Sequence, residues 1–366
     1  MSQRSDFAAF HDELRGVARE MLGATTAAPA DWAKVAAAGW LGLETPEDCD
    51  GSGATFGEVA VVLEEMGRAA TAGPYLGTAV LGVGALLSVD GMPDRDRLLS
   101  GVAAGDARLA VALGPGGAEV EADPPFRLAT TDGGLRLTGT ASFVADAPSA
   151  DVLLLLAEDV GGRPVMVRTG PSALTVTGQP VLDATRSFGT VVADGPVAAG
   201  DVLPLVGRPD DTVAQLRDRA AVAVACDSLG LAAAMLDATV AYAGVRHQFD
   251  RPIGSFQAVK HACADMLVRV TVGRRLLEEA VAAVASGSPE AGTAAARAKA
   301  FVCEAAVEVV GAAMQLHGGI GYTWESGIHV YLKRAVLNRA LAGSPAAHRR
   351  RVAAVIGTRV DDVSTH

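Results

Sequence analysis

The chain has few aromatic residues and few cysteines. Phe, Trp and Tyr make up 4% of its 366 residues, so aliphatic side chains must fill most of the interior, which favours closely packed helices. The four cysteines form no Cys-x-x-Cys pair, and Cys226, Cys263 and Cys303 fall within apolar segments. Such cysteines are typical of small buried thiols in a reducing compartment rather than of a zinc site or a disulfide framework. We therefore expect no metal centre.

Basic residues are outnumbered by acidic ones. The 31 Lys and Arg against 42 Asp and Glu give a formal net charge of −11. This balance argues against a nucleic-acid surface, which needs clustered Lys and Arg. It leaves room for an anionic ligand held by a few local cations.

The sequence also lacks the features of a secretory or membrane segment. Residues 1–15 are polar and charged, unlike a signal peptide. The longest apolar run, residues 220–245, contains Asp227 and Asp237. A membrane span would not carry two carboxylates there. We expect a soluble, cytoplasmic protein.

The first part of the chain, residues 6–102, has the apolar periodicity of helices. One amphipathic helix is predicted over residues 56–68, with apolar residues on one face and Glu64 and Glu65 outside it. Another apolar helix is predicted to begin at Pro74 and to run to about Leu87.

The middle and last parts of the chain differ in texture. Between residues 108 and 201, short apolar or alternating runs separated by Gly, Pro and Asp predict strands at 109–113, 135–140, 151–156, 164–168 and 174–177. From residue 210 onward the pattern is helical again. Three long Ala-rich helices are predicted at 211–248, 255–285 and 289–316.

These zones define a fold class. Long amphipathic helices joined by short turns are what an antiparallel bundle needs. We therefore predict an α+β chain with an N-terminal helical domain over residues 1–105, a small β-sheet domain over 106–205 and a C-terminal antiparallel four-helix bundle over 206–366.

The first motif, residues 246–257, reads RHQFDRPIGSFQ and lies between two of the long helices. Pro252 and Gly254 supply the fixed and unusual backbone angles of a tight turn. Arg246 lies near a helix C-terminus, where a guanidinium is often only a surface charge that compensates the helix dipole. Its functional alternative is an anion-binding group.

The second motif, residues 315–321, reads QLHGGIG and follows the third long helix. Its glycines either end the helix, as glycine commonly does, or leave the backbone open as a cradle for a phosphate or sugar. His317 has no carboxylate at ligand spacing. We therefore expect it to have a packing role rather than a metal or acid–base role.

Taken together, the two motifs resemble those of the acyl-CoA dehydrogenase family. That family binds FAD across a subunit interface with Arg-x-x-Phe-Gly-x-Pro-Ile, a Gln eleven residues after the Arg, and a later Gln-x-x-Gly-Gly. Asp250 stands where the family has the Gly after Phe. Residues 39–47 and 64–68 and the order of the three zones also resemble the family. The resemblance implies a cofactor-binding role for Arg246, Phe249, Gln257, Gln315, Gly318 and Gly319.

The resemblance also implies a catalytic carboxylate, which takes the substrate α-proton while the flavin takes the β-hydride. Family members supply it either 27 residues after the first residue of Gln-x-x-Gly-Gly or at the start of the first long bundle helix. In this chain those positions hold Ala342 and Ala220, which cannot accept a proton. Asp218, Asp227 and Glu325 are weak alternatives.

Two segments of the β zone that face the flavin in the family are altered as well. The family's Thr-Glu-Pro-x-x-Gly-Ser-Asp is replaced by LGPGGAE at residues 113–119. Its Trp-Ile-Thr/Ser is replaced by Phe143, Val144 and Ala145, so the hydroxyl that hydrogen-bonds the ring system is missing.

We therefore hypothesise that the chain is one half of a heteromeric acyl-CoA dehydrogenase, resembling actinobacterial enzymes that degrade steroids. In an α2β2 heterotetramer it would complete the FAD site of a paralogous subunit that supplies the base. The implied partners are an acyl-CoA substrate and an electron-transfer flavoprotein or similar acceptor. One alternative is a homomeric enzyme, a homotetramer, with a relocated base; another is a scaffold protein that binds no flavin.

Overall fold

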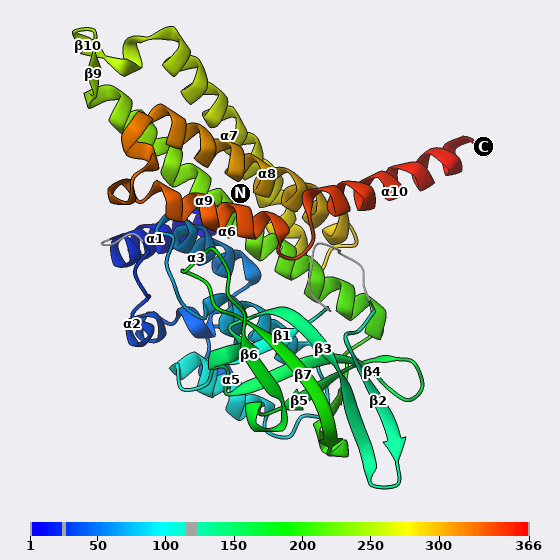
Figure 1. The fold of residues 1–366 in the computed structure, drawn as a ribbon. Helices are drawn as coiled ribbons and strands as arrows, with labels where there is room; N and C mark the ends of the chain where they lie inside the picture. The colour runs from blue at the N-terminus through cyan, green and yellow to red at the C-terminus, as the bar shows by residue number, and fades with distance from the viewer. Residues whose placement is uncertain (1, 24–26, 115–122, 365–366) are drawn as a thin grey trace. The chain divides into compact units, whose positions relative to one another are not determined.

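Figure 1 shows the computed structural model of the chain, which describes residues 2–23, 27–114 and 123–364. The chain forms two compact units. The helical unit consists of Met1–Ala28, Ala60–Thr71 and Ala221–His366, and the sheet unit of Pro29–Val59 and Ala72–Ala220. The predicted order of helical, sheet and helical zones is confirmed. Each unit draws on segments from more than one of the predicted domains. The two units therefore do not test the predicted domain boundaries, which stay a prediction.

Among the described residues, eight strands form the main sheet of the sheet unit. Their order is β6-β7-β3-β2-β4-β5-β8, and β1 pairs in parallel with β4. The strands are β1 (Leu109–Ala112), β2 (Phe126–Thr131), β3 (Gly134–Ala145), β4 (Val152–Glu158), β5 (Pro164–Thr169), β6 (Thr175–Gly178), β7 (Phe188–Val197) and β8 (Val202–Pro204). One face of the sheet buries an aliphatic core that includes Leu153, Leu155 and Val191.

The five predicted strands correspond to β1, β3, β4, β5 and β6. The other three were not predicted, and each has a weak local signal. Strand β2 alternates only at its start, β7 contains Gly and Pro, and β8 has three residues. Their place in the sheet comes from pairing with strands elsewhere in the chain, such as the long antiparallel pair of β3 with β7.

Short helices accompany this sheet within the sheet unit. They are α2 (Trp32–Ala37), a π-helix (Leu76–Gly82), α4 (Val83–Leu87) and α5 (Arg95–Ala104). Single 3-10 turns occur at Trp40–Gly42, Glu47–Cys49, Ala147–Ser149, Pro171–Ala173 and Ala199–Asp201. The apolar helix predicted from Pro74 to Leu87 is therefore real, but its first half has the wider π form.

Long helices dominate the helical unit (Figure 1). They are α1 (Ser2–Leu22), most of α3 (Phe56–Arg68) and of α6 (Pro209–Val245), α7 (Gln257–Ala285), α8 (Ala291–Leu316), α9 (Ile328–Ala340) and α10 (Pro345–Ser364). The three predicted long helices match α6, α7 and α8 to within a few residues. Of the described helices, α6 alone is long and apolar enough to cross a membrane. However, 83% of its apolar window is buried in the protein, as in the core helix of a soluble fold.

The prediction that Glu64 and Glu65 lie outside the packed face of α3 is wrong. Their exposed fractions are 7% and 1%. Arg274 of α7 donates to Glu64 at 2.8 Å, and Arg19 of α1 donates to Glu65 at 2.8 Å. Buried carboxylates require such partners, and periodicity within one helix cannot reveal cations that distant helices supply.

Helices α3 and α6 touch through glycine. A Cβ added at Gly230 of α6 would lie 1.9 Å from the Glu64 carbonyl oxygen, and one added at Gly67 of α3 would lie 2.1 Å from the Asp227 carbonyl oxygen. No side chain can occupy either position without moving a helix. These contacts fix α6 within the helical unit, and α6 in turn carries the first functional motif at its end.

Candidate functional site

The first motif folds into a small hairpin directly after α6. Strand β9 (His247–Gln248) pairs with β10 (Arg251–Pro252), and the Arg246 carbonyl accepts a hydrogen bond from the Ile253 N–H at 2.8 Å. The two residues at the tip, Phe249 and Asp250, have φ of 54° and 58°. Positive φ at both central residues is the requirement of a type I′ turn, which Gly, Asn and Asp adopt most readily. Asp250 can therefore take the place of the family's glycine without losing the turn.

The hairpin presents its functional side chains to solvent. Phe249 is 85% exposed, and Arg246 and Gln257 are exposed beside it. Phe256 supports the tip through two contacts. The Phe249 and Phe256 rings meet edge to face with their centroids 6.1 Å apart, and the Arg251 guanidinium carbon lies 4.1 Å from the centre of the Phe256 ring. The hairpin that carries the motif lies at one end of the long helices α6 and α7 (Figure 1).

The second motif ends α8. His317 is the C-cap residue, and Gly318 follows with φ of 62°, the left-handed conformation in which glycine commonly ends helices. Gly318 and Gly319 are exposed, and a Cβ added at either would meet nothing within 4 Å. The helix-ending role and an open stretch of backbone are therefore both present.

Tyr242 and His317 bring the two motifs together. Their rings stack with centroids 4.4 Å apart and planes at 20°, and the Tyr242 hydroxyl donates to the His317 carbonyl at 3.4 Å. The His317 ring also donates through Nδ1 to the Ala313 carbonyl at 2.7 Å. His317 therefore has the packing role that its sequence context predicts. Sequence reasoning missed Tyr242, since nothing local marks it as the partner of a residue 75 positions away.

The position of the family base is a tightly held loop after α9. Ala342 and Gly343 have φ of 51° and 91°. The Ala342 carbonyl accepts a hydrogen bond from His348 Nε2, and the Gly343 carbonyl accepts one from Lys299 Nζ, both at 2.8 Å. The loop is thus ordered, but its central side chain is a methyl group.

Lys299 and His348, which hold this loop, are completely buried. Burial lowers the pKa of Lys299, and it lowers the pKa of His348 to about 4 because the charged imidazolium would lose its hydration. The hydrogen bond to the Ala342 carbonyl opposes this change, while the cationic Lys299 adds to it. Both residues were missed by sequence reasoning, although a single Lys within an apolar helix is a signal that could have been noticed.

The three weak alternatives for the base are not brought together in one site. Asp227 is buried and bound to Arg334, and it also accepts from Asn338 Nδ2 at 2.6 Å. This arrangement gives its carboxylate a structural role and argues against its use as a proton acceptor. Asp218 is buried in the sheet unit. Glu325 is exposed, and its own N–H and the Thr323 hydroxyl lower its pKa.

The second family position for the base, Ala220, is half-buried on α6 beside Arg219. Arg219 is buried and ion-paired with Glu44. Its Nε donates to the Val80 carbonyl at 2.8 Å, and its guanidinium lies 4.6 Å from the centre of the Phe56 ring. Arg219, the neighbour of Ala220 in the sequence, is therefore held by contacts within the sheet unit.

The altered β-zone segment lies where β3 is irregular. The register of β3 with β7 shifts between Ala141 and Val144, and Phe143 has φ of 54°. The Phe143 N–H donates to Gln179 Oε1 at 2.8 Å. Ala145 is nearly buried and offers no hydroxyl. In the other altered segment, residues 115–119 lie outside the described part of the chain.

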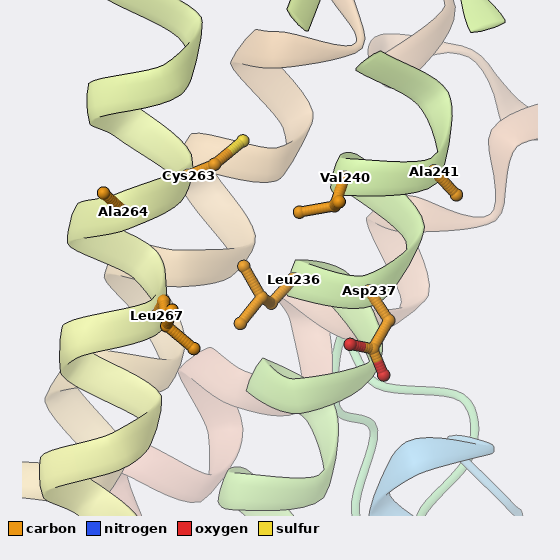
Figure 2. A pocket seen from close by; sticks show the side chains of 7 residues that line it. All are labelled: Leu236, Asp237, Val240, Ala241, Cys263, Ala264 and Leu267. Atoms are coloured by element: carbon orange, nitrogen blue, oxygen red, sulfur yellow. The ribbon is translucent and has the colours of Figure 1, made fainter. Parts of the chain in front are cut away.

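An open groove of about 480 Å³ lies between α6 and α7. Figure 2 shows Leu236 and Val240 of α6 across from Cys263 and Leu267 of α7. Its single carboxylate, Asp237, is bound to Arg68 at 2.7 Å. The groove is mostly apolar and offers no group suited to a phosphate or to proton transfer.

Comparison with known proteins defines the class. The family model for the acyl-CoA dehydrogenase N-terminal domain matches residues 4–106, and that for the C-terminal domain matches residues 214–357. Acyl-CoA dehydrogenase IpdE2 of Mycolicibacterium smegmatis is 33% identical over 318 residues, which cover 87% of this chain and 85% of that protein. The chain therefore belongs to the acyl-CoA dehydrogenase family of flavoprotein oxidoreductases.

Two solved structures make the likeness more specific. A variant of the Tcur3481-Tcur3483 steroid ACAD is 28% identical with a TM-score of 0.84, covering 97% of this chain and 99% of that chain. The ChsE4-ChsE5 complex from Mycobacterium tuberculosis is 28% identical with a TM-score of 0.81, covering 95% and 97%. The resemblance to steroid-type acyl-CoA dehydrogenases that the motifs indicated is confirmed.

Proposed function

We propose that this chain is the base-lacking subunit of a heteromeric, FAD-dependent acyl-CoA dehydrogenase. One observation carries the proposal: the two flavin motifs are folded and joined, while the ordered loop at the base position presents Ala342. The exposed arginine and the two exposed carboxamides stand at the sequence positions at which the family binds FAD. The names of the similar Tcur3481-Tcur3483 and ChsE4-ChsE5 structures, each a pair of chains, support a paralogous partner.

The described residues fit the phosphate-bearing part of FAD. The Arg246 guanidinium supplies positive charge and up to five donors in a planar fork, which suits a pyrophosphate. Gln257 and Gln315 supply carboxamides, and Gly318 and Gly319 leave the main chain uncovered. Bound FAD supplies the acceptor for the hydride that leaves the β-carbon of the acyl group. Arg246, Gln257, Gln315 and the two glycines would hold the cofactor in place during that step.

The partner subunit supplies what this chain lacks. The partner's carboxylate would take the α-proton of the acyl-CoA. Its β domain would face the flavin ring, with which Ala145 of this chain can form no side-chain hydrogen bond. An α2β2 heterotetramer would satisfy both requirements, and an electron-transfer flavoprotein or a similar protein would serve as its electron acceptor. The similarity to a steroid ACAD favours a bulky steroid acyl-CoA as the substrate.

Co-expression tests the proposal. The chain is purified alone and together with an acyl-CoA dehydrogenase paralogue that carries Glu at the position of Ala342, and the flavin absorbance and acyl-CoA turnover of each preparation are measured. We expect a colourless chain alone, and a yellow and active complex. A yellow chain that turns over acyl-CoA by itself would identify a homomeric enzyme with a relocated base. Colourless protein in both preparations would identify a scaffold.

A further inference from the structure

Gln315 and Tyr322 are linked across the glycine turn that follows α8. Gln315 is the penultimate residue of α8 and is exposed. Its Oε1 accepts a hydrogen bond from the Tyr322 hydroxyl at 3.1 Å. Tyr322 is the last residue of the 3-10 helix Gly318–Tyr322, so the bond closes the turn through side chains.

The backbone fixes the position of Tyr322. A Cβ added at Gly321 would lie 2.3 Å from the Met314 carbonyl oxygen, so only glycine lets this turn approach α8 so closely. The Thr323 N–H donates to the Ile320 carbonyl at 3.0 Å, and the Thr323 hydroxyl donates to the same carbonyl at 2.9 Å. The Tyr322 ring itself is 65% exposed. Ring burial therefore contributes little to holding Tyr322, and its hydroxyl is available to Gln315.

A carboxamide has one acceptor oxygen and one NH₂ group with two donors. When the Tyr322 hydroxyl donates to Oε1, the orientation in which the Gln315 amide turns its NH₂ toward the ligand is stabilised. We propose that Tyr322 is a positioning residue for flavin binding, which orients Gln315 so that it presents donors to the phosphate and ribose oxygens of FAD. This inference rests on the proposed function.

The groups around Gln315 are also suited to donate hydrogen bonds. The Arg246 guanidinium can only donate hydrogen bonds, and Tyr242 and His317 join its helix end to that of Gln315. A site in which arginine and amide NH₂ groups both donate selects a ligand rich in acceptors, as a pyrophosphate is. Tyr322 acts through Gln315 and need not touch the ligand.

The test uses the heteromeric complex and measures the FAD dissociation constant by titrating flavin into the apo complex. Tyr322→Phe keeps the ring and removes the donor, and we expect it to raise this constant about fivefold, the effect of one ordinary hydrogen bond. In a Gln315→Ala background the same substitution should have no further effect, because Tyr322 then has no amide to orient. Gln315→Glu should weaken binding more than Tyr322→Phe, because it removes both donors and adds a negative charge.

A second variant separates positioning from packing. If Tyr322→Phe binds FAD as tightly as the wild type while Tyr322→Leu does not, the ring matters rather than the hydroxyl, and the inference is overturned. An additive effect in the Gln315→Ala background would overturn it as well. A wild-type complex that binds no flavin would overturn both this inference and the proposed function. If only this inference fails, the wild-type complex still binds flavin, so the two failures are distinguishable.

Discussion

Asp227 and Arg334 form a buried ion pair in the helical unit, with each side chain 1% exposed. Arg334 Nε lies 2.9 Å from Asp227 Oδ2, and Arg334 NH1 donates to the Thr71 carbonyl at 2.7 Å. The pair thus connects α6, α9 and the segment after α3. Asp227 stands on α6, the helix that precedes the first flavin motif, but the pair serves the fold.

Replacing Arg334 by Leu should lower the free energy of unfolding by about 3 to 5 kcal/mol, because it leaves a buried carboxylate without its cation. Urea unfolding of the two proteins measures the difference. Arg275→Ala is the surface control, since Arg275 is exposed and forms its ion pair with the neighbouring Glu278 at 2.7 Å. That variant should change the stability by less than about 1 kcal/mol. A loss below 1 kcal/mol for Arg334→Leu would show that the pair is dispensable.

Stability should fall in mild acid because of His348. Its pKa is about 4 in the folded chain and near 6.5 when unfolded, so between these pH values the unfolded chain binds a proton that the folded chain does not. Stability is therefore greatest above pH 6.5 and is lost as the pH falls toward 4, by about 3 kcal/mol in total. Urea unfolding across this range measures the slope.

His348→Gln should flatten this slope, because Gln does not titrate. The exposed His247 provides the control, and His247→Gln should leave the slope unchanged. The sensitivity of His348 to acid has a structural reason. Its Nε2 already donates to the Ala342 carbonyl, and its Nδ1 has no hydrogen-bond partner in the described part of the chain. An equal slope in wild type and His348→Gln would assign the acid sensitivity to other groups.

Gly230→Ala should destabilise the chain by about 3 kcal/mol, because its new Cβ would overlap the main chain of α3. Gly311→Ala makes the same chemical change in α8, where a Cβ would meet nothing within 4 Å. That control should be neutral or should stabilise by up to about 1 kcal/mol, since Ala favours a helix over Gly. Thermal unfolding of both variants compares them directly, and equal effects would contradict the close crossing of the helices.

Arg246→Ala should weaken FAD retention in the heteromeric complex about tenfold to a hundredfold, because charge-assisted hydrogen bonds to phosphate are lost. The flavin-to-protein absorbance ratio after gel filtration measures this loss. Arg275→Ala again serves as the control with equal loss of charge, and it should keep its flavin. Unchanged flavin content in Arg246→Ala would remove Arg246 from the site.

Sequence reasoning succeeded where the signal is local. Helical periodicity predicted α7 over residues 255–285, against an observed Gln257–Ala285, because each turn of a helix repeats the pattern. It failed where the contact is distant. Glu64 was expected outside the packed face of its helix, yet its partner Arg274 stands 210 positions away. The same limit hid Lys299, whose importance depends on a loop more than 40 residues away.

The site was predictable to a similar degree. Both flavin motifs were visible as motifs, because a turn and a helix end need particular residues at fixed spacing. The contact between the two motifs could not be predicted from the sequence, because it depends on the stacking of Tyr242 on His317. Whether the predicted residues bind FAD stays a prediction that the experiments above address.

The hairpin tip has a consequence for finding further chains of this kind. Asp250 holds φ of 58° in a position where the family motif specifies glycine. A search pattern that demands Arg-x-x-Phe-Gly would pass over this chain, although its turn is intact. Because backbone angle rather than residue identity is the requirement, a pattern that admits Asp and Asn after Phe should recover further chains in which this turn is intact.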